Sequence, residues 1–324
     1  MVKLRRLSLV PIILLGLAAT NLVSGCKRSP GAISISSGTP NGYYNRLATQ
    51  IGQAAQQTVD LPVQNLDSEG SRQNLQRLLD RQTDFALTQL DVVNEAMRQG
   101  QVKAVAILAN EPIHIIAQEQ ANLRSLLDLN NKRIGLGSQG SGIRFTAEQL
   151  IQSSRLNIRE DSSGFEDVFR KLATRQLDAA IYVGSTGASE KLRQELTSNP
   201  SLQLLPIPPA LVNYLTTRNP GAYQTATIRS GTYNARPAVP DPNIPTLSTA
   251  TVLVTRPDVK DETVSLLTWA ILYNSRQLSP FYPELQTGEA RSLLQRGLFY
   301  IHPGAQSVYA QNADPRDAWL RYIE

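Results

Sequence analysis

Residues 33–55 read ISISSGTPNGYYNRLATQIGQAA, and residues 133–151 read RIGLGSQGSGIRFTAEQLI. Each stretch begins as a short apolar strand, passes through a turn rich in glycine and serine, and ends with apolar residues at helical spacing. A strand joined to a helix by a short turn is the repeating unit of α/β folds with parallel sheets. Because the unit occurs in both halves of the chain, we expect an α/β fold with two lobes of similar plan.

The same alternation of strands and helices extends outward from these two stretches. Residues 71–79, 165–173 and 258–278 have helical patterns, and residues 314–322 predict a last short helix. Residues 206–245 hold eight of the 19 prolines, so we expect a surface excursion there with one helix near Ala210–Thr217. Further strands are predicted at Val63–Leu66, Asp84–Thr88, Ala104–Ala109, Ile113–Ala117, Ala179–Val183 and Leu247–Thr255.

The two halves also share a local string of residues. We expect each copy to end a helix and to enter a strand at an aspartate, which gives Asp84 and Asp178 structural roles. The alternative is that the match between the two nine-residue strings is a coincidence. The matching strings are Leu78-x-x-Arg81-Gln82-x-Asp84-x-Ala86 and Leu172-x-x-Arg175-Gln176-x-Asp178-x-Ala180.

The first residues of the chain resemble a bacterial lipoprotein leader. A positively charged start precedes the apolar segment Leu7–Ala19, which is too short to span a bilayer comfortably. Val23-Ser24-Gly25-Cys26 follows and resembles a lipobox, in which the cysteine thiol receives the lipid. We therefore expect residues 1–25 to be a signal peptide, Cys26 to be the lipid anchor, and residues 26–30 to be a tether in a periplasmic or extracytoplasmic protein. An ordinary cleaved signal with a stray cysteine is the alternative.

Composition excludes several other classes. Removal of residues 1–25 lowers the formal charge from +5 to +2, and the rest of the chain has no run of five like charges, so nucleic acid is not an expected partner. Cys26 is the only cysteine, so no intramolecular disulfide can form. No apolar stretch after the leader approaches membrane-spanning length.

The two glycine-rich turns are the expected binding site. The free N–H groups and the dipole at a helix start favour an anion, and serine or threonine hydroxyls add hydrogen-bond donors. The alternative is that these segments are simply efficient turns. We expect the ligand to contact Thr39 and Tyr43 from the first turn, and Ser138, Ser141 and Gly142 from the second.

Short motifs follow one another along most of the chain after the leader. They are Gly38-Thr39-x-x-Gly42-Tyr43-Tyr44, Ser71-x-x-Asn74-Leu75, Gln89-Leu90-Asp91, Gly137-Ser138-x-Gly140-Ser141-Gly142, Asp178-Ala179-Ala180, Gly231-Thr232-Tyr233, Ile244-Pro245-Thr246 and His302-Pro303-Gly304-Ala305. In this order they resemble the TAXI family of solute receptors associated with TRAP transporters, and the resemblance covers nearly all of residues 31–310. The chain departs from the family pattern at Arg72, Gln89 and Leu90, and also at Ile143 and Arg144, where the family commonly has threonine and then an acidic residue.

The resemblance implies a two-lobed clamshell of the periplasmic-binding-protein type II-like fold. Residues 31–113 and 247–324 would form lobe I and residues 114–246 lobe II, with crossings near Ile113–Ala117 and Leu247–Thr255. It further implies a small amino-acid-like or dicarboxylate-like ligand, with glutamate and glutamine first, and delivery to a TRAP permease. Arg144 adds a cation that favours an anionic ligand. Further expected ligand contacts are Gln89, Arg144, Gly184 and Thr186.

Two other classes of function stay open at this point. Gly135-x-Gly137-x-x-Gly140 with Asp161 fits the dinucleotide pattern, which alone is weak evidence for an enzyme. The only histidines are His114 and His302, which we expect to be structural, and no hydrolase or metal-binding motif is present. We therefore expect no enzyme activity, no cofactor and no metal. A sensory or assembly lipoprotein with the same fold is the main alternative to a transport receptor.

Overall fold

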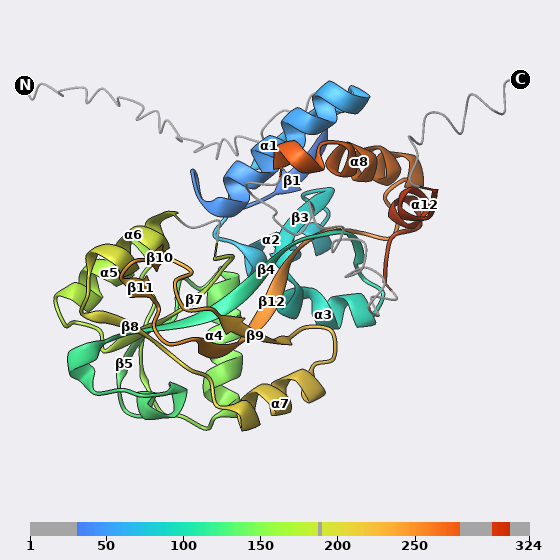
Figure 1. Cartoon of the computed structure of the whole chain (residues 1–324). Helices are drawn as coiled ribbons and strands as arrows, with labels where there is room; N and C mark the ends of the chain where they lie inside the picture. Colours follow the sequence, from blue (N-terminus) through green and yellow to red (C-terminus); the bar gives the residue numbers. More distant parts are fainter. Residues whose placement is uncertain (1–30, 187–189, 279–299, 312–324) are drawn as a thin grey trace, which may run out of the picture. The chain divides into compact units, whose positions relative to one another are not determined.

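Two long strands, β4 (Lys103–Gln118) and β12 (Ile244–Thr255), lie antiparallel in the middle of the sheet (Figure 1). The computed structural model describes residues 31–186, 190–278 and 300–311. The strand order is β2-β1-β3-β12-β4-β7-β5-β6, with β8 paired to β4 and β9 paired to β12. Each long strand therefore pairs with different neighbours along its length: β12 with β3 and β9, and β4 with β7 and β8, in one mixed sheet.

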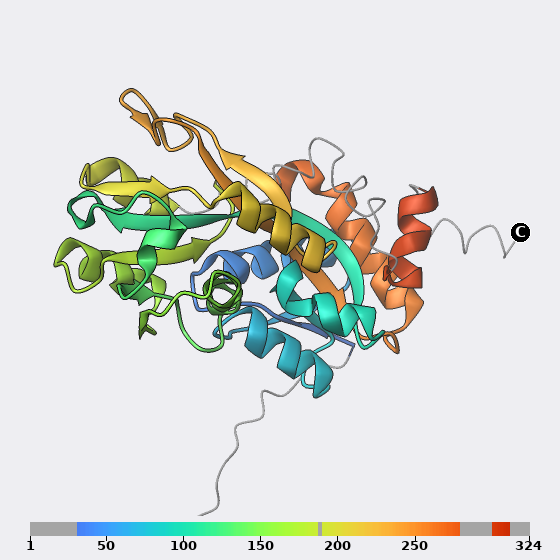
Figure 2. The same ribbon diagram turned by 90° about the horizontal axis from the view of Figure 1, so that it is seen from below.

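The shorter strands form a parallel group at each end of this sheet. β1, β2 and β3 are parallel to one another, as are β5, β6 and β7. β10 and β11 form a separate hairpin (Figure 2). The bounds are β1 (Ile33–Ser36), β2 (Val63–Leu66), β3 (Phe85–Gln89), β5 (Arg133–Gly135), β6 (Arg159–Asp161), β7 (Ala179–Val183), β8 (Leu202–Leu205), β9 (Gln224–Ile228), β10 (Asn234–Ala235) and β11 (Ala238–Val239).

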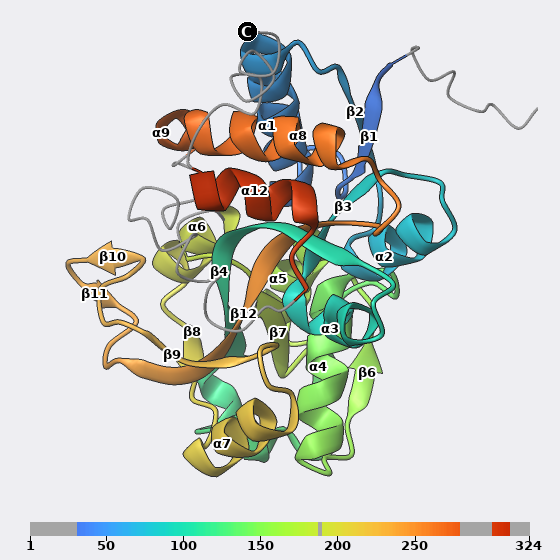
Figure 3. The same ribbon diagram turned by 90° about the vertical axis from the view of Figure 1, so that its right-hand side faces the viewer.

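The helices form two groups, with β4 and β12 running between them (Figure 3). The first group is α1 (Tyr43–Val59), α2 (Ser71–Leu79), α3 (Leu90–Arg98), α8 (Asp261–Tyr273), α9 (Ser275–Leu278) and α12 (Pro303–Gln311). The second group is α4 (Gly142–Ser153), α5 (Phe165–Ala173), α6 (Glu190–Ser198) and α7 (Pro209–Arg218), with the short 3-10 helices η1 (Glu119–Ala121) and η2 (Leu126–Leu129).

The buried apolar side chains divide along the two long strands. On β4, residues up to Leu108 belong to clusters with the first helix group, and residues from Ile113 belong to clusters with the second. On β12 the same change takes place between Leu247 and Ala250. We call these two sets of clusters the first core and the second core. Each is a hydrophobic core of its own, joined to the other by two strands.

The structure differs from the sequence predictions along β4 and within residues 206–245. Ala104–Ala109 and Ile113–Ala117 are not two strands but one, because β4 continues through Pro112 while it changes its partner from β12 to β7 and β8. Within residues 206–245 the predicted helix is present as α7, but β9 was missed. Most of β9 is polar and exposed, so it lacks the apolar alternation that marks a strand.

The repeated string of nine residues has the same local structure in both copies. Asp84 Oδ2 accepts the N–H of Ser34 on β1 at 2.8 Å, and Asp178 Oδ2 accepts the N–H of Arg133 on β5 at 2.8 Å. Each aspartate thus connects the strand it precedes to the neighbouring parallel strand. The arginines three residues earlier both have positive φ, 60° at Arg81 and 57° at Arg175. These aspartates are structural, as expected.

The leader, Cys26 and the predicted helix 314–322 lie outside the described residues. Within the described part of the chain, no helix is long and apolar enough to cross a membrane.

Candidate functional site

The two glycine-rich turns meet at a cavity of about 270 Å³. The first turn connects β1 to α1, and it contributes Gly38, Thr39, Gly42, Tyr43 and Tyr44 to the lining. The second turn connects β5 to α4, and it contributes Ser141, Gly142 and Ile143. The start of one helix from each core therefore faces the same space.

Glycine at position 42 is required by the tightness of the first turn. The Gly42 N–H donates to the Thr39 carbonyl at 2.8 Å, and a Cβ at position 42 would lie 2.8 Å from Thr39 Oγ1. Gly42 is the N-cap of α1, and this residue makes no side-chain capping bond to the helix. The first N–H groups of α1 therefore have no side-chain acceptor from the N-cap.

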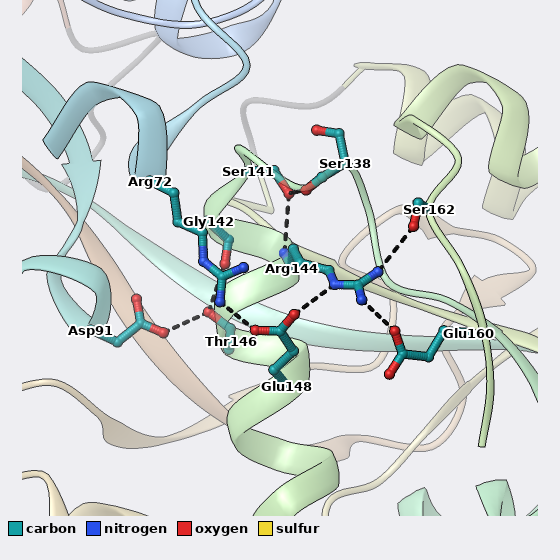
Figure 4. Close-up of polar contacts among 10 residues, drawn as sticks. All are labelled: Arg72, Asp91, Ser138, Ser141, Gly142, Arg144, Thr146, Glu148, Glu160 and Ser162. Carbon is teal, nitrogen blue, oxygen red and sulfur yellow. Dashed lines mark hydrogen bonds and ion pairs between the residues drawn. The ribbon is translucent and has the colours of Figure 1, made fainter. Parts of the chain in front are cut away.

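Ser141 has a structural role at the second turn (Figure 4). Its Oγ accepts the Arg144 N–H at 3.1 Å, which caps α4, and it donates to the Ser138 carbonyl at 2.7 Å. The Ser138 side chain is not part of the cavity lining. The hydroxyl that we expected to contact the ligand is thus already used to fix the turn.

The structure places Arg144 outside the cavity lining, where it does not supply the expected cation. Its Nε donates to Glu148 Oε1 at 2.7 Å, and its other nitrogens contact Glu160 and the Ser162 hydroxyl (Figure 4). Its side chain is only 7% exposed. Because two carboxylates surround this guanidinium, it is a buried structural group and not a ligand contact in this arrangement.

The second turn also contacts the start of α2 directly. The Gly140 carbonyl accepts the N–H groups of Arg72 at 3.1 Å and of Gln73 at 3.3 Å. The Gly140 N–H donates to Glu69 Oε2 at 3.1 Å. The Arg72 side chain forms an ion pair with Glu148 on α4 (Figure 4). These bonds connect the first and second cores at one edge of the cavity.

Asp91 is a second connection between the cores, and sequence reasoning missed its role. Its Oδ2 accepts the hydroxyls of Thr146 at 2.5 Å and Tyr223 at 2.9 Å. Its Oδ1 accepts the Val92 N–H at 3.0 Å. Burial raises the pKa of Asp91 to about 6, although these bonds favour the ionised form. The signal was present in the motif Gln89-Leu90-Asp91, which marked the residue but not its partners.

Glu111 is a buried carboxyl in the cavity wall, and it was also missed. It is 3% exposed, lines the cavity, and its Oε2 accepts the Tyr44 hydroxyl at 3.2 Å. Burial raises the pKa of Glu111 to about 8. An acidic residue between two apolar strand segments was the available signal. It lies in the gap between the predicted strands Ala104–Ala109 and Ile113–Ala117.

Gln89 completes this part of the wall. It is 3% exposed and lines the cavity, and its backbone N–H donates to Ser71 Oγ at 3.0 Å. Its Oε1 has no hydrogen-bond partner among the described residues. A Cβ at position 142 would lie 1.7 Å from this oxygen, so only glycine fits beside it at the start of α4.

Two aromatic pairs line the cavity, one from each core. The Phe165 and Tyr182 ring centroids are 4.6 Å apart, and the Tyr43 and Tyr44 centroids are 5.9 Å apart. A solute in this space would therefore contact aromatic faces as well as polar groups.

The predicted ligand contacts divide into two sets. The structure places Thr39, Tyr43, Gln89, Ser141, Gly142 and Gly184 in the cavity lining. It does not place Ser138, Arg144 or Thr186 there; Thr186 is half-buried beside residues 187–189, which are not described.

The residues that could have indicated a nucleotide-dependent enzyme or a hydrolase have structural partners. The Asp161 carboxylate of the dinucleotide pattern accepts a hydrogen bond from Lys171 Nζ at 2.5 Å. His114 is buried beside the Tyr233 hydroxyl, and burial lowers its pKa to about 4. His302 Nδ1 accepts the Gly304 N–H at 3.2 Å, which supports the turn as expected. Among the described residues, no group of three histidine, cysteine or acidic side chains could hold a metal ion.

Solved structures with similar folds bind small molecules. The GluR0 ligand-binding core in complex with L-glutamate is 14% identical, with a TM-score of 0.50 over 77% of this chain and 96% of that one. An ancestral arginine-binding protein bound to arginine is 11% identical, with a TM-score of 0.50 over 79% of this chain and 97% of that one. These similarities show the two-lobed type II periplasmic-binding-protein fold. The model of the NMT1-like family matches residues 35–312, and since this match spans both cores and the cavity between them, the chain belongs to the NMT1-like family.

Proposed function

We propose that the chain is an extracytoplasmic solute-binding receptor that holds one small molecule in the cavity between its two cores. The observation that carries this proposal is the cavity of about 270 Å³, lined by a glycine-rich turn and a helix start from each core. A ligand that touches both cores favours the arrangement in which they are close together. Residues 31–113 with 247–324 form one lobe in this proposal, and residues 114–246 form the other.

The proposed ligand is small and anionic or amino-acid-like. The start of α1 has no side-chain cap and no acidic residue in its first turn, which suits a carboxylate. Glutamate and glutamine come first because of the resemblance to the TAXI receptors. The proposal includes no catalytic step.

Delivery to a TRAP permease and anchoring through Cys26 complete the proposal. The resemblance to the TAXI receptors supports the permease, and the lipobox-like segment supports the anchor. A sensory or assembly lipoprotein would use the same cavity without a permease. Neighbouring genes distinguish a transport receptor from a sensory lipoprotein, because a permease gene favours transport and a sensor kinase gene favours signalling.

Calorimetry combined with small-angle scattering tests the receptor proposal. We expect one solute from a panel of amino acids, amines and carboxylic acids to bind with a stoichiometry of one and to reduce the radius of gyration; tight binding without contraction would contradict the clamshell receptor. Recovery of the unaltered solute afterwards is also expected. Chemical conversion of the solute, or silence across the whole panel, would contradict the proposal.

A further inference from the structure

Helix α2 of the first group begins against a backbone carbonyl of the second turn. Its N-cap is Gly70, which makes no side-chain capping bond to the helix. The Gly140 carbonyl instead accepts the N–H groups of Arg72 at 3.1 Å and of Gln73 at 3.3 Å. The first N–H groups of a helix have no acceptor within the helix, so a carbonyl beside the second core satisfies two donors beside the first.

Gly140 is bonded to the first core through its N–H as well. This N–H donates to Glu69 Oε2 at 3.1 Å. A Cβ at position 140 would lie 2.5 Å from Glu69 Oε2 and 2.7 Å from Glu69 Cβ. The second turn can therefore come this close to the start of α2 because residue 140 is glycine.

The Arg72 side chain adds a charged contact beside these backbone bonds. It forms an ion pair with Glu148 on α4 (Figure 4), and its guanidinium carbon lies 5.3 Å from the centroid of the Phe145 ring. Arg144 Nε donates to the other Glu148 oxygen at 2.7 Å, which fixes the carboxylate from within the second core. Burial disfavours the charged form, but the hydrogen bonds from Arg72 and Arg144 lower the pKa of Glu148 below its ordinary value. This carboxylate is therefore ionised at neutral pH.

These contacts lie beside the cavity and not in it. Arg72, Gly140 and Glu148 are outside the described cavity lining. The contacts exist only while the start of α2 and the second turn are adjacent, so separation of the two lobes breaks them. Any effect of these residues on solute affinity therefore acts through the closed arrangement.

We infer that Arg72 and Gly140 form a latch that determines how long the receptor retains its solute, without contact to the solute. The inference rests on the proposed function and concerns retention at the same cavity. In a chain that is mainly open without solute, bonds made only in the closed form add to the affinity. Because they form after the solute has entered, they should slow dissociation and leave association unchanged. Arg72 is a positioning residue in this inference.

Arg72→Met tests the charged part of the latch, because it keeps the length of the side chain and removes the charge. The full chain in detergent is titrated with L-glutamate and with the rest of the panel of amino acids, amines and carboxylic acids. The best solute of the wild type should bind this variant at least about fivefold more weakly, with faster dissociation in stopped flow. The difference should shrink between about 0.05 M and about 0.5 M NaCl, since salt screens a partly exposed ion pair. Arg72→Lys keeps the charge and should recover part of the affinity.

The solute-free chain separates a latch from a structural ion pair. Its urea midpoint should be the same in Arg72→Met and in the wild type, because the latch is open without solute; a lower midpoint in the variant contradicts the latch. Arg98→Met is the matched control, since Arg98 on α3 forms its ion pair with Glu95 on the same helix. This control should bind solute like the wild type.

Hydrogen exchange measures the backbone part of the latch. The amides of Arg72 and Gln73 should exchange more slowly once solute is bound, because the Gly140 carbonyl reaches them only in the closed form. Gly140→Ala should abolish this protection and weaken the best solute by at least about fivefold, whereas Gly164→Ala, whose added Cβ meets nothing within 4 Å, should change neither.

The outcomes distinguish this inference from the proposed function. Equal dissociation rates in Arg72→Met and the wild type, or unchanged exchange of the two amides on binding, would overturn the latch and leave the receptor proposal intact. Silence across the solute panel would overturn both. If Gly140→Ala does not fold, Arg72→Met decides.

Discussion

Asp91 Oδ2 and Thr146 Oγ1 lie 2.5 Å apart, which makes this hydrogen bond a direct connection between α3 and α4 (Figure 4). Asp91 is 6% exposed and Thr146 is 0% exposed. The carboxylate therefore depends on its protein partners for hydrogen bonds, and two of them, Thr146 and Tyr223, come from segments of the second core. A buried charge with partners on both cores holds them together more specifically than apolar contact alone.

Thr146→Val should destabilise the protein by about 1.5–3 kcal/mol, because it removes a hydrogen bond to a charged group at nearly constant shape. Chemical denaturation measures the loss. Thr197→Val, at an exposed position on α6, is the matched control and should change stability by less than about 0.5 kcal/mol. Equal effects from both substitutions would show that the bond to Asp91 contributes nothing.

Stability should fall as the pH rises from about 4.5 to 8. Burial holds the pKa of Glu111 at about 8 and that of Asp91 at about 6, above their ordinary values of 4.5 and 3.8. The folded chain therefore binds more protons than the unfolded chain in this range, and the contribution is lost as the pH rises through the folded pKa values. Urea denaturation at pH 5, 6, 7 and 8 measures the slope. Glu111→Gln should flatten it above pH 6; an unchanged slope in that variant argues against a raised pKa.

Gly142→Ala should be disruptive, with a loss of about 1–3 kcal/mol and weaker solute binding. The added Cβ would lie 1.7 Å from Gln89 Oε1 and 2.6 Å from Ser71 Oγ, so it must displace both side chains. Gly164→Ala is the matched control, since Gly164 also lies at the start of a helix and a Cβ there meets nothing within 4 Å. Its effect should stay within about 1 kcal/mol. A wild-type affinity in Gly142→Ala would show that the Gln89 side chain is not needed in its present place.

Cys26→Ala should abolish labelling by radioactive palmitate and release the protein from membranes. The prediction follows from the lone thiol at the end of the lipobox-like segment. Fractionation of cells that express either form measures the release. Palmitate incorporation by the variant would rule out Cys26 as the anchor. The purified variant should still bind solute, because the cavity is lined by described residues from Gly38 onward and the substitution changes none of them.

The strand, turn and helix units could be predicted because the information is local. The two glycine-rich turns, the helices α1, α2, α4, α5, α7 and α8 and the strand-entry aspartates Asp84 and Asp178 depend on neighbours within a few residues, and these were predicted. The elements α3, α6, β6, β8 and β9 were not predicted.

Side-chain direction could not be predicted, because distant segments determine it. Arg144 was expected to contact a ligand, but its guanidinium forms an ion pair with Glu160 on β6. Ser141 was expected to contact the ligand through a hydroxyl that instead caps α4. Glu111 could not be recognised as part of the cavity wall, nor Asp91 as a connection between the cores, because their partners come from distant parts of the chain.

The position of β12 between β3 and β4 has a consequence for how the chain acquires its fold. Thr255 on β12 donates its hydroxyl to the carbonyl of Asp84, 171 residues earlier. Until the ribosome has delivered β12, the first three strands have neither their central neighbour nor the cover of α8. Such long-range pairing slows folding. We therefore expect nascent chains to stay open to proteases until late in synthesis, which would keep an exported chain in a form that can be threaded across a membrane.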